Sequence, residues 1–174
     1  DLYDENVIAR LAQADSQLST ILSGMDFGQD VLAAFEPGVE IVVAESNSSG
    51  AYVRDVKLPA FAVVGRLKNP ESIRRRLKIA FQSVIGFANI NLGMQGQPQL
   101  DLETETIGTA KVSATEYYVA EDMEEGLLLF NFSPTIAFQG STMIVSSTRK
   151  LAVELAELAA EKNTQSPTTD STPN

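Results

Sequence analysis

The stretch LDLETETI, residues 100–107, decides the fold class of this chain. Its residues alternate between two sets, with Leu100, Leu102, Thr104 and Thr106 in one set and Asp101, Glu103, Glu105 and Ile107 in the other. Successive side chains of a β-strand point to opposite faces of a sheet, so this period of two predicts a strand. A strand with one charged face is typical of an antiparallel sheet that has one face in water.

Short apolar and β-branched runs predict further strands on both sides of this stretch. They comprise residues 39–44 (VEIVVA), 59–67 (PAFAVVGRL), 111–120 (KVSATEYYVA), 126–132 (GLLLFNF), 135–138 (TIAF) and 142–147 (TMIVSS). Residues 39–44 are expected to form a buried strand, because the run is short, β-branched and bounded by turn residues. Gln139 and Gly140 predict a tight hairpin between the last two runs. An acidic turn at residues 120–126 is expected to be solvated.

Three longer segments have the three- and four-residue apolar spacing of amphipathic helices. The first spans residues 7–25 and carries its apolar stripe on Val7, Ile8, Leu11, Leu18, Ile21, Leu22 and Met25. The second follows Asn69, which suits a helix cap, and Pro70, which suits the first helical position, and it ends at about residue 90. The third spans residues 148–162, and a short helix is expected at residues 29–35.

These elements predict an α+β fold with a mainly antiparallel sheet of about five to seven strands and helices packed on one face. A ferredoxin-like crossover is one topology that fits. Residues 1–162 are expected to form a single domain, with N-terminal helices in residues 1–36 and the sheet and two helices in residues 39–162. Residues 163–174 (NTQSPTTDSTPN) contain no apolar side chain and predict a disordered Ser/Thr/Pro-rich tail.

The composition excludes several classes of site. The chain has no histidine, cysteine or tryptophan, so Ser–His–Asp triads, thiol nucleophiles and zinc–thiolate sites are ruled out. No cofactor or metal ion is expected. Thirteen basic and twenty-three acidic residues give a net charge of −10, which repels nucleic acid. No apolar run approaches the roughly 18–20 residues needed for a transmembrane segment.

One basic cluster departs from the acidic charge of the chain. It consists of six of the thirteen basic residues, namely Arg66, Lys68, Arg74, Arg75, Arg76 and Lys78. On an acidic protein such a cluster favours binding to an anionic polymer, to lipid headgroups or to an acidic partner. The alternative is the ordinary solvated face of a helix, in which long basic side chains also cover apolar surface.

Other patterns suggest chemistry with less specificity. Ser147 and Lys150 match the S-x-x-K motif of serine hydrolases, although Ser147 is also well placed to cap the helix that follows. Phe81, Ile85 and Phe87 widen the apolar surface of the second helix, which suits either core packing or an apolar ligand.

The acidic face of the strand expected at residues 100–107 can also be interpreted in two ways. Asp101, Glu103 and Glu105 have carboxylates that could bind calcium or act as a glycosidase pair. Alternating charge on the wet face of an antiparallel sheet explains the same pattern without any function.

Two segments also resemble a known family. Residues 59–70 (PAFAVVGRLKNP) and 132–147 (FSPTIAFQGSTMIVSS), each with its following helix, are similar to a family of uncharacterised bacterial envelope proteins. The similarity covers about residues 59–161. It implies export and an α+β unit of a longer protein, and it assigns no catalytic residue.

The leading hypothesis is therefore a non-catalytic binding or structural module of the bacterial cell envelope. Its expected location is the periplasm or envelope, in keeping with a chain that begins at Asp1 without methionine. Its expected partner is an envelope protein or an anionic polymer. The alternatives are a carrier of an apolar or lipid-like ligand and a histidine-free hydrolase.

Overall fold

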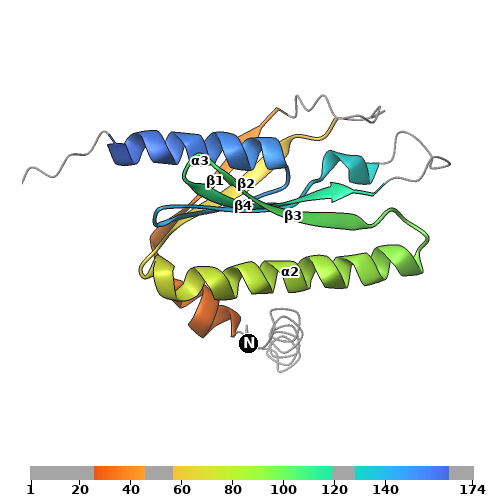
Figure 1. Cartoon of the computed structure of the whole chain (residues 1–174), viewed down its shortest axis with the longest axis horizontal. Coiled ribbons are helices and arrows are strands. Elements are labelled where there is room, and N and C mark those ends of the chain that lie inside the picture. Colours follow the sequence, from red (N-terminus) through yellow and green to blue (C-terminus); the bar gives the residue numbers. More distant parts are fainter. Residues whose placement is uncertain (1–25, 46–56, 119–127, 165–174) are drawn as a thin grey trace, which may run out of the picture.

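A computed structural model describes residues 26–45, 57–118 and 128–164. Its centre is a six-stranded sheet with the order β1-β2-β6-β5-β4-β3, in which every pair of neighbours is antiparallel (Figure 1). The strands are β1 Phe35–Ala44, β2 Ala60–Leu67, β3 Leu100–Ile107, β4 Ala110–Tyr117, β5 Thr135–Gln139 and β6 Thr142–Ser146. The predicted α+β class with an antiparallel sheet is confirmed.

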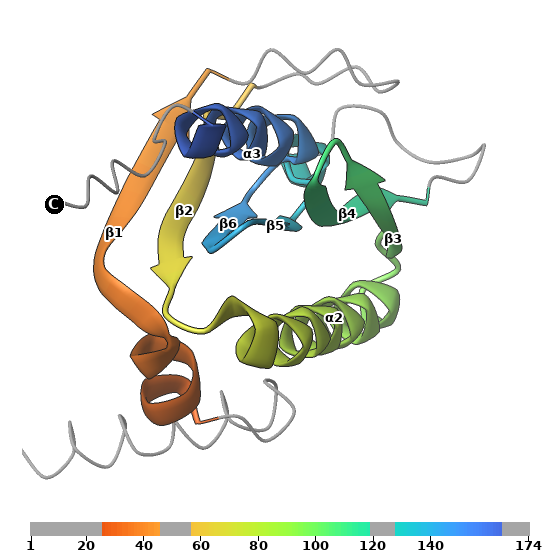
Figure 2. The ribbon, with the colours of Figure 1, turned by 60° about the vertical axis from the view of Figure 1, so that its left-hand side comes forward.

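Two long helices cover opposite faces of this sheet. Helix α2 (Pro70–Met94) lies on one face and α3 (Arg149–Thr164) lies on the other, so the molecule has three layers (Figures 1 and 2). The prediction that both helices pack on one face is wrong. The central strands carry apolar side chains on both faces, and all five residues of β5 are buried, so each face needs its own helix.

Small side chains line the face under α3. Ala62, Ala137 and Ile144 are completely buried there, against Ala152 and Ala156 of α3. Alanine leaves little volume between the backbones, so the helix lies close to the sheet. The central part of this face buries apolar surface in close packing.

Larger side chains fill the face under α2. Leu67, Ile136, Phe138 and Met143 of the sheet pack there, against Ile73, Leu77 and Ala80 of the helix. The three helix residues recur at three- and four-residue spacing and form the inner stripe of α2. Asn89, further along α2, pairs with both backbone groups of Leu100, so it ties the end of the helix to the start of β3.

One predicted strand is wrong. Residues 126–132 were expected to be extended, but Leu128–Asn131 form a short 3-10 helix, η3. The buried Asn131 side chain accepts a hydrogen bond from Leu58 N–H and donates one to the carbonyl of Leu128. A short apolar run has no periodicity that separates a strand from a helical turn, so these side-chain bonds decide the conformation.

The chain order of the elements determines the topology. Helix α2 carries the chain from β2 to β3 at the opposite edge of the sheet, and β6 then inserts between β2 and β5. This order is not the βαββαβ order of a ferredoxin-like domain. Short helical turns η1 (Phe27–Val31) and η2 (Leu32–Ala34) precede β1, in the place of the short helix expected there.

Three predicted segments lie outside the described residues. They are the helix at residues 7–25, the acidic turn at residues 120–126, and the tail beyond Thr164. Helix α3 continues to Thr164, which is two residues beyond the predicted end of the domain at residue 162.

Replacing Ile144 with alanine should lower the free energy of unfolding by about 2–5 kcal/mol, because the side chain is completely buried between the sheet and α3. Chemical denaturation followed by circular dichroism measures this loss. Leu158→Ala on the exposed side of α3 is the control and should change the stability by less than about 1 kcal/mol. Equal losses in both variants would contradict this description of the core.

Candidate functional site

The most exposed apolar surface of the sheet lies on β1 and β2. It consists of Val39, Ile41, Val43, Phe61 and Val63, which we call the β1–β2 face. Ile41 is directly opposite Val63 in the strand register, and Val43 is opposite Phe61. Cross-strand partners point to the same side of a sheet, so these side chains form one continuous apolar surface.

The β1–β2 face is exposed because α2 does not extend over it. Helix α2 packs on β5 and β3, and Figure 2 shows β1 and β2 to one side of it. Ile41 is 75 % exposed, Val43 is 67 % exposed and Phe61 is 49 % exposed. The prediction that residues 39–44 form a buried strand is therefore wrong for one face of β1. The strand lies at the edge of the sheet, and only Val42 and Ala44 pack toward α3.

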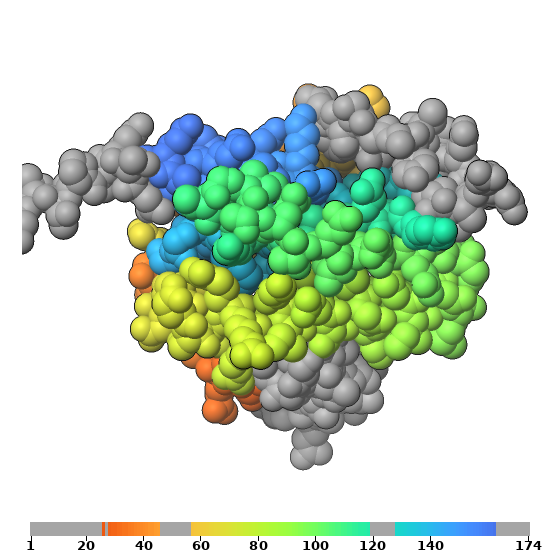
Figure 3. Space-filling model, viewed as in Figure 1, coloured from red at the N-terminus to blue at the C-terminus, as the bar shows by residue number. Residues whose placement is uncertain are grey.

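The two edges of the sheet differ in charge. The outer strand β3 carries Asp101, Glu103 and Glu105, and the β3–β4 hairpin lies between α2 and α3 on the molecular surface in Figure 3. Charged residues on an edge strand discourage pairing with another chain. Strand β1 has a register irregularity between Phe35 and Val39, but its last four residues, IVVA, carry no charge. The stretch Ile41–Ala44 is thus less protected than β3, whereas charges, Pro37 and the register irregularity protect the earlier part of β1.

The predicted basic cluster does not form a single patch. Arg66 lies on β2 and pairs with Glu36 at 3.9 Å. Lys68 follows β2, and its Nζ donates a hydrogen bond to the carbonyl of Ala33 at 2.9 Å. Lys68 thus holds the segment before β1, and Arg66 holds the start of β1, against the end of β2.

Arg74 fastens α2 to the turn between β5 and β6. Its Nη2 donates a hydrogen bond to the carbonyl of Gly140 at 2.9 Å and lies 3.8 Å from the carboxylate of Glu71. The guanidinium also lies over the ring of Phe138, 5.9 Å from its centre. These contacts give Arg74 a structural role.

Arg76 joins α2 to the segment before β1. Its guanidinium lies 3.3 Å from the carboxylate of Asp30. The N–H of Asp26 also donates a hydrogen bond to this carboxylate. The Asp26 hydrogen bond and the Arg76 guanidinium together hold the pKa of Asp30 below its ordinary value of 3.8.

Arg75 and Lys78 are the two members of the cluster without a hydrogen bond or ion pair to a described residue. Arg75 is exposed, and Lys78 is half-buried on the next turn of α2. The structure therefore leaves only this pair of cations available on α2. A binding role for the six residues stays a prediction.

Ser147 has a structural partner. It is buried, and its hydroxyl accepts a hydrogen bond from Phe61 N–H at 3.0 Å. The Nζ of Lys150 lies 3.9 Å from the carboxylate of Glu154. The cap of α3 is Thr148, whose hydroxyl accepts a hydrogen bond from Leu151 N–H. The prediction that Ser147 caps this helix is wrong, because Ser147 instead fixes the start of β2.

The carboxylates of β3 also gain a structural explanation. Asp101, Glu103 and Glu105 lie on the side of the sheet that faces α3, and Glu105 pairs with Arg149 at the start of that helix. Within residues 26–45, 57–118 and 128–164, no three acidic side chains come together in a way that could hold a metal ion.

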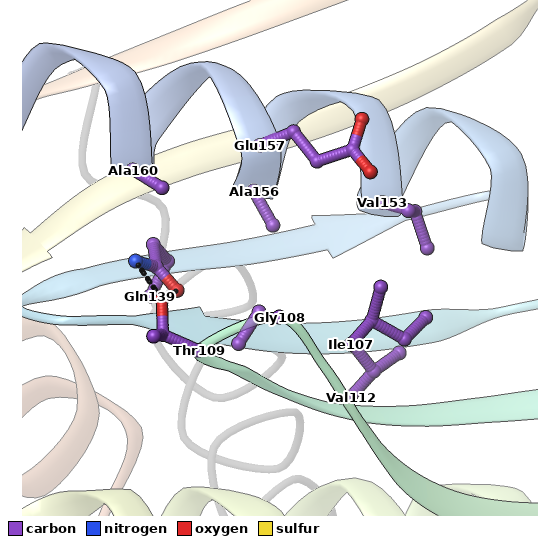
Figure 4. A pocket seen from close by; sticks show the side chains of 10 residues that line it. Ile107, Gly108, Thr109, Val112, Gln139, Val153, Ala156, Glu157 and Ala160 are labelled. Atoms are coloured by element: carbon purple, nitrogen blue, oxygen red, sulfur yellow. Dashed lines mark hydrogen bonds between the residues drawn. The ribbon is translucent and has the colours of Figure 1, made fainter.

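A cavity of about 230 Å³ lies between α3 and the β3–β4 turn (Figure 4). Ile107, Val112 and Val153 line one end, and Thr109 and Gln139 form a hydrogen-bonded pair at the other. Typical ligand pockets measure roughly 300–1,000 Å³, so this cavity is small for a lipid. It also lies on the opposite side of the sheet from Phe81 and Ile85, so it lends no support to the predicted apolar site on α2.

Comparisons with protein-family models, curated proteins and solved structures found no match to this chain. The resemblance to a bacterial envelope family therefore stays a prediction. None of the helices in the described part of the chain combines the length and apolar character needed to cross a membrane.

Replacing Arg74 with methionine should lower the free energy of unfolding by about 1–2 kcal/mol, because it removes the bond to Gly140 and the contact with Phe138. Arg75→Met is the matched control on the next residue and should change the stability by no more than about 0.5 kcal/mol. Thermal and chemical denaturation measure both effects. A larger loss of stability in the Arg75 variant than in the Arg74 variant would contradict the structural role assigned to Arg74.

Replacing Asp30 with asparagine should alter the pH dependence of stability. The lowered pKa means that the charged Asp30 stabilises the fold above pH 3.8, and this contribution is lost as the pH falls through the lower pKa of the folded state. The stability difference between the original chain and the variant should therefore shrink in acid. Denaturation at a series of pH values tests this, with Glu103→Gln as the control, and the same trend in the control would refute it.

Proposed function

We propose that this chain is a non-catalytic binding module of the bacterial cell envelope. Its partner is an envelope protein that adds an extended segment to the edge strand β1. The main observation in support is the β1–β2 face, in which Ile41 and Val43 are 75 % and 67 % exposed at the uncharged end of the edge strand. Large exposed apolar patches on folded domains mark interaction sites more often than chance.

The position of this face favours strand addition over other modes of binding. An edge strand has a row of backbone N–H and C=O groups without a neighbour, and an extended segment can pair with them. The side chains of that segment would alternate between the two faces of the sheet. On the α2 side they would extend the apolar surface of Ile41 and Val43.

The charge of Glu40, on the α3 side of β1, indicates which side chains a partner segment should carry there. Glu40 is directly opposite Val64, whose side chain packs on the α3 side, so Glu40 points to that side as well. It is exposed, and no ion pair joins it to a described residue. A partner segment with apolar residues on one face and a lysine or arginine on the other complements β1 on both faces.

The competing hydrolase hypothesis has less support. Its nucleophile candidate, Ser147, is buried and accepts a hydrogen bond from Phe61 N–H, and Lys150 lies beside Glu154. A serine nucleophile needs a base within hydrogen-bonding distance and an accessible hydroxyl. The envelope location rests on the family resemblance, which covers about residues 59–161.

The test is site-specific photo-crosslinking. A photoreactive phenylalanine analogue at position 61 should crosslink to a protein in a bacterial envelope fraction. The double substitution Ile41→Ser and Val43→Ser should reduce this crosslinking by at least about tenfold, because it removes two apolar side chains from the interface. Mass spectrometry of the crosslinked peptide should identify an extended segment of alternating apolar and polar residues.

The controls distinguish specific binding from nonspecific binding of exposed apolar side chains. The same analogue at position 158 on α3, where Leu158 is 52 % exposed, should give little crosslinking. Circular dichroism checks that the double variant remains folded. Equal crosslinking at both positions, equal capture from a cytosolic fraction, or crosslinking only to a second copy of the chain would each overturn the proposal.

A further inference from the structure

The cavity between α3 and the β3–β4 turn has a buried interior and an exposed rim. Its volume is about 230 Å³ (Figure 4). The buried residues of its lining are Ala110, Val112, Gln139 and Ala156. The exposed residues of its lining are Gly108, Thr109 and Glu157. The cavity thus opens between the turn and the helix, and a small molecule can reach it from solvent.

Small residues create this space. Val153, Ala156 and Ala160 recur on α3 at intervals of three and four residues, so they face the sheet from the same side of the helix. Gly108 adds no side chain from the turn, and no atom outside its chain neighbours lies within 4 Å of the position where one would begin. A larger side chain at position 153 or 160 would therefore fill the cavity.

The volume limits the size of a ligand. An apolar cavity of roughly 150 Å³ accepts benzene. A cavity of about 230 Å³ thus has space for a benzene-sized ring with a short substituent. The ring suits the end of the cavity formed by the apolar side chains of Ile107, Val112 and Val153.

The polar groups of the lining indicate the charge of the ligand. Thr109 and Gln139 hydrogen-bond to each other, at 3.1 Å to the amide oxygen and 2.8 Å to the amide nitrogen, so each already has a partner. No ion pair joins Glu157 to a described residue. Its carboxylate extends along α3 toward Val153, at the apolar end of the cavity (Figure 4). A carboxylate there attracts a cation and repels an anion.

We propose that this cavity binds a small organic cation, namely an amine on a compact apolar skeleton about the size of a benzene ring. The skeleton lies among Ile107, Val112 and Val153, and the ammonium group lies against the carboxylate of Glu157. The site is on the α3 side of the sheet, so it is independent of the β1–β2 face and goes beyond the partner binding proposed above.

Three compounds that share one ring and differ in charge test this proposal. At neutral pH benzylamine is a cation, benzyl alcohol is neutral and benzoate is an anion. Titration of the full chain, followed by NMR of the methyl groups of Ile107, Val112 and Val153, measures binding at this site. At low salt, benzylamine should bind about fivefold more tightly than benzyl alcohol, because only the amine forms an ion pair with Glu157. Benzoate should bind more weakly than either.

Two glutamate variants separate the contact with Glu157 from the general attraction of an acidic protein for cations. Glu157→Gln should abolish the preference for benzylamine and leave the affinity for benzyl alcohol within about twofold. Glu161→Gln is the matched control, because it removes the same charge from the next turn of α3, outside the cavity lining. The control should keep the preference for benzylamine.

Cavity-filling variants test the apolar part of the site. Val153→Phe should weaken binding of all three compounds at least about tenfold, and Ala160→Leu fills the cavity from its other end, so the test survives a folding failure of either variant. Leu158→Phe, on the exposed side of α3, should leave binding unchanged. Circular dichroism verifies that each variant is folded.

Four results would overturn the proposal. They are the absence of methyl shifts with all three compounds, benzoate binding as tight as that of benzylamine, equal effects of the Glu157 and Glu161 variants, and binding that persists in folded cavity-filling variants.

Discussion

The close packing of α3 on the alanine-rich face of the central strands is the contact on which the fold depends. This helix touches β2, β6, β5 and β4, so it holds together strands from both ends of the sequence. The alanines at positions 62, 137, 152 and 156 have almost no solvent exposure, which leaves no room for a larger side chain. The aromatic and most of the long apolar side chains of the central strands, such as Phe138 and Met143, lie on the opposite face, where α2 covers them.

The unequal coverage of the two faces explains where apolar surface remains. Helix α3 crosses most of the sheet, whereas α2 packs mainly on β5 and β3 and reaches β2 only at Leu67, the last residue of that strand. The α2 side of β1 and β2 is consequently left open, although its side chains are as apolar as those in the core. Two of the four basic residues of α2 have structural roles, since Arg74 bonds Gly140 and Arg76 pairs with Asp30. We therefore place the proposed partner on the open apolar face rather than on the basic cluster.

Periodicity in the sequence was sufficient to locate most elements, because the alternation of residues 100–107 and the Asn69–Pro70 helix start are local signals. It was insufficient where distant groups decide the outcome. The 3-10 turn before β5 depends on a bond between Asn131 and Leu58. The exposure of Ile41 depends on where α2 lies, and a run such as VEIVVA has the same composition in a central strand and at an edge. The partners of Arg74 and Ser147 likewise come from other segments.

The insertion of β6 between β2 and β5 has a consequence for synthesis on the ribosome. The β1–β2 hairpin and the β3–β4–β5 unit can each form locally, but neither contacts the other through the sheet until residues 142–146 have emerged. The final strand thus closes the fold late, and α3 follows it directly. Until that moment β2 and β5 both present open edges, so the nascent domain is most vulnerable to misassembly just before residues 142–146 emerge.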